Sequence, residues 1–355
     1  MLVLENIPLA PLTTIKIGGP ARYFVEAGNA GEVQEAVTFA RSRHLPLFIL
    51  GGGSNLVVAD TGWPGLVLKI AIQGINQVQH SGHNEQGKVL FQAGAGESWD
   101  RFVSHTVMAH CAGVECLSGI PGSVGGTPVQ NVGAYGQEVA ETISSVQVLD
   151  LRDNDSQVRE LCSEACGFSY RASIFNTTER GRFIVLRVTF ALTPGGSPHI
   201  AYADLMRHFE GRETLPNLAE TREAVRHIRA RKGMLITPGD PDCLSAGSFF
   251  KNPVLSEEQH EDLKQRAAAR GLTLPSYPAL ETRKKVSAAW LVERSGFAKG
   301  FGFGRVGIST RHALAIVNRG EATAADVLAL KDQIQHRVEE IWGVRLEPEP
   351  VMVGF

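Results

Sequence analysis

The chain has 355 residues, of which 43% are hydrophobic, with 35 lysines and arginines against 37 aspartates and glutamates. That length exceeds what one hydrophobic core usually fills, so we expect more than one domain. The net charge of -2 excludes the broad basic field typical of proteins that bind nucleic acid or anionic membranes, and we expect neither partner. The first residues lack the basic start of a signal peptide, and no apolar run approaches the roughly 20 residues of a membrane span.

The first elements are predicted to form a strand–helix–strand unit. Residues 21–27 alternate like a strand, residues 31–44 place apolar side chains on one helical face, and residues 45–50 form an apolar strand. This last strand runs into GGGSN at residues 51–55, where α/β proteins commonly bind ligands. Three consecutive glycines favour a nest of backbone N–H groups for a phosphate, and the alternative is a tight turn without a ligand.

Strands at 66–70 and 88–94 and a helix at 97–110 are predicted to lead into LSGIPGSVGGTPVQNVGAYG, Leu117–Gly136. This glycine-rich stretch contains six glycines and no charged side chain among its twenty residues. It cannot be an ordinary helix or strand, because each interior glycine costs about 0.5–1 kcal/mol relative to alanine. Glycine also lets backbone N–H groups approach a ligand, so we interpret the stretch as a wall that holds a large polar ligand. The alternative is a mobile surface loop.

The middle of the chain is predicted to be α+β, with strands at 145–151 and 182–192 and a polar turn at Arg152–Asp155. In SYRAS, Tyr170 and Arg171 are embedded among apolar residues. The planar fork of arginine suits a carboxylate or a phosphate, and a structural ion pair is the alternative.

Five cysteines, an odd number, predict free thiols in a reducing cytoplasm rather than a disulfide framework. Cys162 and Cys166 lie four residues apart in a segment that we predict to be helical. No histidine stands at a partner spacing, so we expect no metal site. An excursion at 194–216 carries Tyr202, and a helix follows at 218–233. The basic residues of Arg222–Lys232 alternate with apolar ones, which predicts a solvated helix face.

The last third opens with SAGSFFKNPV at Ser245–Val254. The predicted elements after it are a helix at 256–269, a helical segment at 285–300, a strand at 312–318, a core helix from Thr323 and a strand at 344–354. A GxGxxG pattern at 302–307 follows a helical segment and precedes a strand. This is the reverse of the dinucleotide-binding order, so we exclude that function for it.

Five motifs, taken together, resemble one family. LPLFILGGGSN, the glycine-rich stretch continued by QE, SYRAS, GSFFKNP and LEPEP occur in the order found in UDP-N-acetylenolpyruvoylglucosamine reductases (MurB, type I), from about Thr14 to Val353. The resemblance implies an α+β chain with a two-subdomain FAD-binding module of the vanillyl-alcohol-oxidase (PCMH) type and a C-terminal α+β substrate domain. The implied domains are subdomain 1 at 1–70, joined by strand 346–355, subdomain 2 at 71–225, and the substrate domain at 226–345.

The resemblance also implies a cofactor, an activity and a location. NADPH would provide a hydride that reaches, through non-covalent FAD, C3 of the enolpyruvyl ether of UDP-N-acetyl-enolpyruvoylglucosamine, and a proton would arrive at C2. The product would be UDP-N-acetylmuramate for peptidoglycan, made by a monomer in the bacterial cytoplasm. The implied FAD-binding residues are Leu50, Gly51, Gly52, Gly53, Ser54, Asn55, Ser118, Pro121, Gly122, Ser123, Gly125, Gly126, Thr127, Gln130, Asn131, Gly133, Ala134 and Tyr135.

Three residues match the catalytic positions of the family. Arg171 would neutralise charge that builds on the substrate carboxylate, which hydride addition to carbon requires. Ser248 would protonate C2, with a turn-capping role as the alternative. Glu349 would act as a protonated carboxyl group, and Glu347 is the alternative by spacing.

The implied substrate contacts are Tyr170, Tyr202 on a loop that folds over the nucleotide-sugar, Lys232 near the diphosphate, and Asn252. Arg294 departs from the pattern, because some members carry glutamine there. Two other functions remain open: a different flavin oxidase on the same scaffold, and a nucleotide-sugar-binding regulator. Many such oxidases tether flavin through histidine or cysteine, which neither glycine segment contains. A regulator would be expected to have lost part of the catalytic set.

Overall fold

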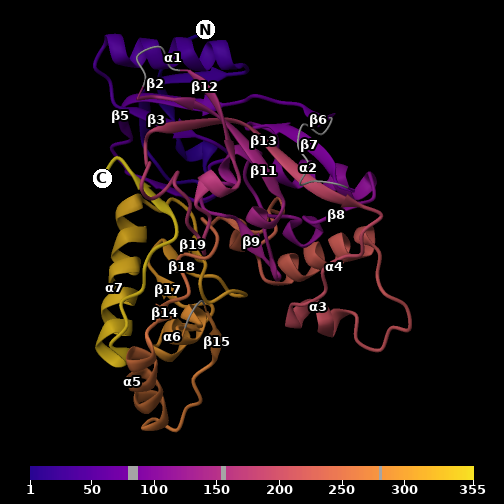
Figure 1. Cartoon of the computed structure of the whole chain (residues 1–355). Helices are drawn as coiled ribbons and strands as arrows, with labels where there is room; N and C mark the ends of the chain where they lie inside the picture. Colours follow the sequence, from indigo (N-terminus) through magenta and orange to yellow (C-terminus); the bar gives the residue numbers. More distant parts are fainter. Residues whose placement is uncertain (79–86, 153–156, 280–281) are drawn as a thin grey trace. The chain divides into compact units, whose positions relative to one another are not determined.

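A computed structural model describes residues 1–78, 87–152, 157–279 and 282–355. The chain divides into two compact units, each with its own hydrophobic core (Figure 1). The N-terminal unit comprises residues 1–7, 21–52 and 64–230, and the C-terminal unit comprises residues 8–20, 53–63 and 231–355. The three-domain division expected from the sequence stays a prediction. Within the described residues, no helix combines the length and apolarity needed to cross a membrane.

The first sheet of the N-terminal unit has the strand order β1-β2-β5-β3. Helix α1, Ala30–Ser42, is capped by Asn29, whose side chain accepts the Glu32 N–H. The buried apolar side chains of α1 belong to the core of the unit. The predicted strand–helix–strand unit is confirmed as β2, α1 and β3, although β5 lies between the two strands and runs parallel to β3. The strands are β1 Leu4–Pro8, β2 Pro20–Ala27, β3 Leu47–Leu50 and β5 Trp63–Ile70.

The second sheet has the order β12-β11-β13-β7-β6, with β8 also paired to β13, and its pairings are antiparallel. Helix α2, Trp99–Met108, packs Phe102 against Phe190 of β13, with ring centroids 4.6 Å apart. The predicted strands of this region are confirmed. The bounds are β6 Ile75–Val78, β7 Val89–Gly94, β8 Cys111–Ala112, β11 Ile143–Asp150, β12 Val158–Cys162 and β13 Phe183–Pro194.

The segments on either side of β12 differ from the predictions or lie partly outside the described residues. The predicted helix over Cys162–Cys166 is wrong, because Cys162 ends β12, which pairs with β11, and Cys166 ends the 3-10 helix Glu164–Cys166. Pairing along the edge of the sheet therefore outweighs the four-residue spacing. In the predicted turn at Arg152–Asp155, residues 153–155 lie outside the described residues.

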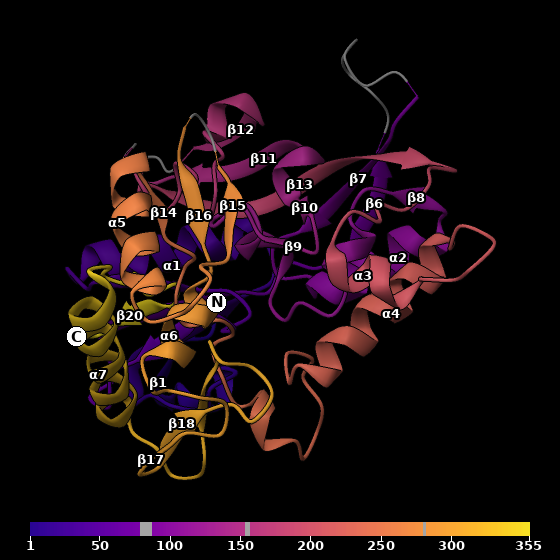
Figure 2. The ribbon, with the colours of Figure 1, turned by 90° about the horizontal axis from the view of Figure 1, so that it is seen from below.

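Helices α3, Ala203–His208, and α4, Leu218–Arg231, complete the N-terminal unit and lie side by side (Figures 1 and 2). The rings of His208 and His227 are 6.0 Å apart. Helix α4 confirms the predicted helix at 218–233. The short strands β9, Gly133–Ala134, and β10, Gln137–Glu138, pair antiparallel at the end of the glycine-rich stretch.

The C-terminal unit is built around α7, Ala324–Trp342, which packs against α5, Glu257–Ala268, and α6, Ala288–Arg294. Thr323 begins α7 with a capping box, as the predicted helix start requires. The GxGxxG pattern lies in a hairpin of β17 and β18, which agrees with its exclusion as a dinucleotide site. The strands are β4 Leu56–Val58, β14 Val254–Leu255, β15 Ser276–Pro278, β16 Lys284–Val286, β17 Gly302–Phe303, β18 Val306–Ile308, β19 Ile316–Asn318 and β20 Val351–Val353.

Candidate active site

The two predicted cofactor segments meet inside the N-terminal unit. A Cβ atom on Gly52 would lie 2.5 Å from the Cα of Gly122, and one on Gly51 would lie 2.8 Å from the Ser123 Oγ. The backbones can approach this closely only because glycine occupies the contact. The structure therefore brings the start of the GGGSN loop against the centre of the glycine-rich stretch. Gly53 belongs to the C-terminal unit, where its carbonyl accepts the Thr14 N–H at 3.0 Å.

The start of α2 holds the glycine-rich stretch in place. The backbone N–H of Trp99 donates to the Gly122 carbonyl at 3.1 Å, and its indole Nε1 donates to the Leu117 carbonyl at 3.0 Å. Asp100 Oδ1 accepts the N–H of Gly119 at 2.6 Å. The stretch is thus packed and hydrogen-bonded, as the wall interpretation expects and the mobile-loop alternative does not.

Asn131 joins the stretch to the SYRAS segment. Its backbone is left-handed, with φ 43°, and its side-chain amide donates to Glu138 Oε2 at 2.7 Å and to the Ser169 carbonyl at 3.1 Å. Its Oδ1 accepts the N–H of Ala140 at 3.1 Å. Because these contacts use both ends of the amide, Asn131 fixes the shape of the wall.

Tyr170 and Arg171 occupy the middle of a tight turn. Ser169 and Ala172 close it with two backbone hydrogen bonds of 2.9 and 3.1 Å. Arg171 has a left-handed φ of 55°, and its carbonyl accepts a hydrogen bond from Asn176 at 3.1 Å. A left-handed arginine is an unfavourable conformation that persists only when its surroundings impose it. The turn presents a half-buried guanidinium whose Nη2 donates to the Gly133 carbonyl at 2.8 Å.

The excursion that carries Tyr202 is attached to the end of the same stretch. The ring of Tyr202 packs edge-to-face on Tyr135, with centroids 5.4 Å apart. The buried carboxylate of Glu115 accepts the His199 N–H at 2.9 Å and the Gln137 side-chain amide at 2.8 Å. Arg171, Tyr170, Tyr135 and Tyr202 therefore all belong to segments that contact the glycine-rich stretch.

The two other predicted catalytic residues come together in the C-terminal unit. Phe250 and Pro348 form an antiparallel bridge, and the Glu349 N–H donates to the Phe249 carbonyl at 2.9 Å. Because Ser248 precedes Phe249, Ser248 and Glu349 lie on adjacent, backbone-paired segments. Glu347 is 77% exposed at its side chain and lies 3.6 Å from the Lys251 Nζ, whereas Glu349 is half-buried.

The predicted substrate contacts of this unit have mixed surroundings. The Oδ1 of Asn252 accepts the Ala288 N–H at 2.9 Å, so the first turn of α6 occupies its carbonyl end. Lys232 is half-buried just after α4, and Arg294 is exposed at the end of α6.

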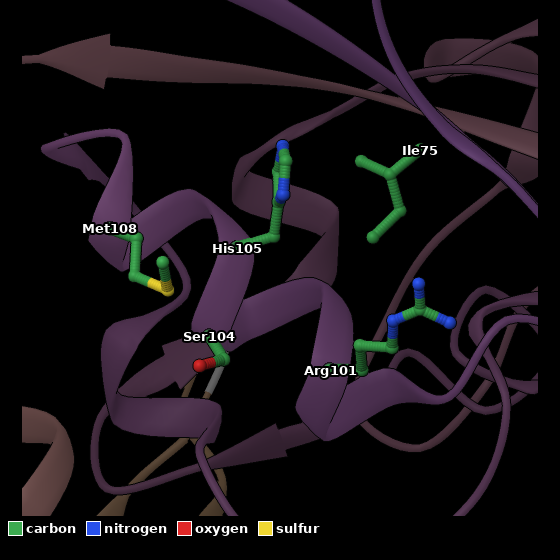
Figure 3. Close-up of a pocket in the computed structure, with 5 residues that line it drawn as sticks. All are labelled: Ile75, Arg101, Ser104, His105 and Met108. Carbon is green, nitrogen blue, oxygen red and sulfur yellow. The ribbon is translucent and has the colours of Figure 1, made fainter.

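A cavity of about 300 Å³ lies elsewhere in the N-terminal unit. Figure 3 shows its lining side chains, of which four come from α2 and none is a predicted site residue: Ile75, Arg101, Ser104, His105 and Met108. Among the described residues, no group of three or more histidines, cysteines, aspartates or glutamates could hold a metal ion.

The chain matches two family models and is similar to known proteins over nearly its whole length. Residues 21–160 match the family model "FAD binding domain", and residues 240–353 match "UDP-N-acetylenolpyruvoylglucosamine reductase, C-terminal domain". The chain is 46% identical to the UDP-N-acetylenolpyruvoylglucosamine reductase of Streptomyces coelicolor over 358 aligned residues. The alignment covers 99% of this chain and 90% of that protein. The enzyme of Thermobifida fusca is 44% identical, over 99% of this chain and 98% of its own.

The chain belongs to the UDP-N-acetylenolpyruvoylglucosamine reductase family. The crystal structure of the MurB reductase from Thermus caldophilus agrees, with a TM-score of 0.64, 28% identity and 99% of each chain covered. The predicted fold class is confirmed, since this α+β chain has an FAD-binding domain followed by the C-terminal domain of the reductase family. The predicted cofactor, FAD, is confirmed by the same match, and this family member is an FAD-dependent oxidoreductase.

The glycine-rich stretch suits FAD by its own chemistry. The Oγ of Ser123 is buried and has no hydrogen-bond partner within the part of the chain that the structure describes. A Cβ atom on Gly126 would meet no atom within 4 Å. An unused buried hydroxyl and an uncovered glycine in a stretch without charge are features of a surface that a neutral, planar group can cover.

The charged residues that support this wall were not predicted from the sequence. The solvated-face prediction for Arg222–Lys232 is wrong for three arginines: Arg222 and Arg226 bind Asp100 with N···O distances of 2.7 Å, and Arg229 is only 6% exposed. These arginines are spaced i, i+4, i+7 and share one helix face. That spacing was the available signal. Asp100, the partner of Arg222 and Arg226, lies more than 120 residues earlier in the chain.

Proposed function

We propose that this chain reduces UDP-N-acetyl-enolpyruvoylglucosamine to UDP-N-acetylmuramate with NADPH, a step in the synthesis of the peptidoglycan precursor. Family membership over 99% of the chain supports the proposal. The observation of this structure that carries it furthest is the pairing of GSFFKNP with LEPEP, because it places an acid candidate and a carboxyl group on adjacent segments.

FAD, when bound, supplies the hydride-transfer chemistry. The residues of this chain that would hold it are those of the GGGSN loop and of the glycine-rich stretch. The stretch offers backbone groups and neutral side chains, among them the buried Ser123 hydroxyl. Since the wall contributes no charge, the charge that catalysis needs would come from other segments.

Arg171 would bind the carboxylate of the enolpyruvyl group. Addition of a hydride to C3 places negative charge on C2 and this carboxylate, and a positioned guanidinium stabilises such charge. The left-handed turn and the contact with the Gly133 carbonyl fix the orientation of Arg171 before the substrate arrives.

Ser248 would deliver the proton to C2, with Glu349 as the carboxyl group beside the reacting centre. A serine hydroxyl is a weak acid, so its position must be set in advance. The backbone supports this requirement, because the next residue, Phe249, donates to the Leu314 carbonyl at 2.7 Å and accepts from Glu349 at 2.9 Å. Glu349 fits the role better than Glu347, which is exposed and lies beside Lys251.

Tyr170, Tyr202, Lys232 and Asn252 would contact the UDP-sugar. Tyr202 is 44% exposed and is therefore accessible to a large ligand. For Asn252, the amide nitrogen would be the donor to the ligand, since its oxygen already accepts the Ala288 N–H. We further propose that the chain acts as a monomer in the bacterial cytoplasm, and its five free cysteines are consistent with a reducing compartment.

Anaerobic stopped-flow kinetics of Ser248→Ala would test the proposal. NADPH should reduce the bound flavin at nearly the wild-type rate, whereas reoxidation by the enolpyruvyl substrate should slow by about 10²–10⁴-fold, the usual contribution of a positioned proton donor. Equal losses in both half-reactions would assign Ser248 a structural role. A wild-type protein that is purified without flavin and cannot bind FAD would contradict the proposal as a whole.

A further inference from the structure

Gly119, near the start of the glycine-rich stretch, is held at both of its backbone polar groups by charged side chains. Its N–H donates to Asp100 Oδ1 at 2.6 Å, and its carbonyl accepts from Arg229 Nε at 3.1 Å. Its φ of 71° lies in the left-handed region. A glycine has no side chain that packing could hold, so these two contacts fix the direction of its peptide groups.

The two residues that hold Gly119 are themselves fixed. Arg222 binds Asp100 with both terminal nitrogens, at 2.7 and 2.9 Å, and Arg226 adds a third bond at 2.7 Å. Asp100 is also the first acidic residue of α2, where it lies near the helix N-terminus. Asp100 therefore connects α2, α4 and the glycine-rich stretch through one carboxylate.

Arg229 reaches a second point of the stretch. Besides the Gly119 carbonyl, it is hydrogen-bonded to the side chain of Tyr135, near the other end of the stretch. Tyr135 in turn contacts the ring of Tyr202. Burial lowers the pKa of the Arg229 guanidinium, and Tyr135 and Asp100 oppose that shift. A buried cation is unfavourable unless it is paired, so these partners account for a buried arginine beside a neutral wall.

We propose that Arg229 and Asp100 are positioning residues for the cofactor: together they hold Gly119 and Tyr135, and thereby set the backbone of the wall that binds FAD. The inference rests on the proposed function, because it takes FAD as the bound group. Both residues lie outside the glycine segments, Asp100 on α2 and Arg229 on α4. Helix α4 would therefore shape the FAD-binding surface without being part of it.

The test compares FAD binding with the stability of the FAD-free protein. Flavin is removed from wild type, Arg229→Gln, Arg229→Lys and Arg231→Gln, and FAD is titrated back while flavin fluorescence and visible circular dichroism are recorded. Arg231 is an exposed arginine at the end of the same helix and serves as the matched control. Melting temperatures of the FAD-free proteins are measured in parallel.

For Arg229→Gln we expect FAD to bind at least about tenfold more weakly, which corresponds to about 1.4 kcal/mol, with an altered flavin circular dichroism spectrum. Arg229→Lys keeps the charge but loses the planar donor fork, so it should restore part of the affinity. Asp100→Asn should act in the same direction by a smaller factor, because the amide oxygen can still accept. Arg231→Gln should bind FAD like wild type.

An Arg229→Gln protein with a lower melting temperature but an FAD affinity within about twofold of wild type would overturn the proposal and leave Arg229 a structural residue. If Arg229→Gln does not fold, Arg229→Lys decides in the same way, since it retains the buried charge. Failure of the wild-type protein to bind FAD would contradict the proposed function, and it would be visible before any variant is compared.

Discussion

The glycine-rich stretch of the N-terminal unit and the Ser248–Glu349 segments of the C-terminal unit are held in opposite ways. In the stretch, charged side chains from outside, those of Asp100 and Arg229, hold the backbone of Gly119. In the catalytic segments, the backbones hold each other, through the Phe250–Pro348 bridge and its flanking hydrogen bonds.

The difference follows from what each region must present. A wall for a neutral planar group offers its own backbone, so side chains from other segments contribute to its support. Segments that deliver a hydroxyl and a carboxyl group offer side chains, so their support comes from backbone pairing. In both regions the functional groups are held in place by contacts with their surroundings, as a preorganised site requires. Substitutions in the wall should therefore change FAD binding or stability, whereas substitutions in the catalytic segments should change the reaction rate. Four predictions test this difference.

The largest effect is expected from the catalytic segments, in the pair Glu349→Gln and Glu347→Gln. Loss of the half-buried carboxyl group at 349 should slow reoxidation of the flavin by the substrate by about 10²–10⁴-fold, because proton delivery and charge stabilisation both depend on it. The exposed Glu347 should tolerate the same change within about twofold, since surface ion pairs contribute little. Stopped-flow absorbance measures both. A larger loss for Glu347→Gln would exchange the two assignments.

The effect of Arg171→Lys should be intermediate in size. The side chain of Arg171 would contact the substrate, but it is held by the Gly133 carbonyl of the wall. The ammonium keeps the charge and loses the planar fork, so kcat should fall by about 10–100-fold. Its KM for the sugar nucleotide should rise, while FAD affinity stays near wild type. Tyr170→Phe, at the neighbouring turn position, is the control and should change kcat by less. Loss of FAD from Arg171→Lys would instead make Arg171 part of the wall.

Gly52→Ala should damage the wall without reaching the chemistry. Its new Cβ atom would lie 2.5 Å from Gly122 Cα, and the backbones must separate to relieve that contact. Overpacking of this kind costs about 1–3 kcal/mol of unfolding free energy. Gly126→Ala adds the same methyl group where no atom lies within 4 Å, so the FAD-free protein should keep its stability in urea unfolding. Equal stability losses would show that close approach is not the reason for glycine at 52.

The elements that could be predicted are those whose cause is local. The N-cap of α7 at Thr323 and the apolar face of α1 follow from neighbouring residues, and both are present. The helix predicted over Cys162–Cys166 failed because a partner strand, distant in the chain, decides that segment. The five motifs identified the family, since each is a local pattern retained in order.

The support of the site was not predictable in the same way. Arg222, Arg226 and Arg229 have the composition of a solvated face. Their partners are distant in the chain: Asp100 binds Arg222 and Arg226, and the Gly119 carbonyl accepts from Arg229. Likewise, nothing near Glu115 in the chain indicates that its carboxylate accepts the His199 N–H. The spacing of the three arginines shows that they share one helix face. The sequence does not show which distant residue that face meets, because a long-range polar contact leaves no pattern near its partner in the chain.

The smallest expected effect depends on pH and separates Asp100 from Asp150. Burial alone would raise the pKa of Asp100, but hydrogen bonds from Arg222 and the Gly119 N–H outweigh it and hold the pKa below its ordinary value. The hydrogen bond from Arg182 lowers the pKa of Asp150 to about 2. Because both folded pKa values lie below the unfolded value of about 3.9, each contribution is complete above that pH and is lost as the pH falls through the folded pKa.

The two carboxylates should nevertheless report on different properties. Asp150 joins β11 to the residue before β13, so Asp150→Asn should move the acid-unfolding midpoint and leave FAD affinity at pH 7 unchanged. Asp100 joins α2 and α4 to the wall, so Asp100→Asn should weaken FAD binding by about threefold to tenfold at pH 7, near 1 kcal/mol, and reduce its acid dependence below about pH 4. FAD titrations and urea unfolding across pH 3 to 7 measure both. Equal effects of the two variants on FAD affinity would mean that Asp100 supports the fold as a whole rather than the wall.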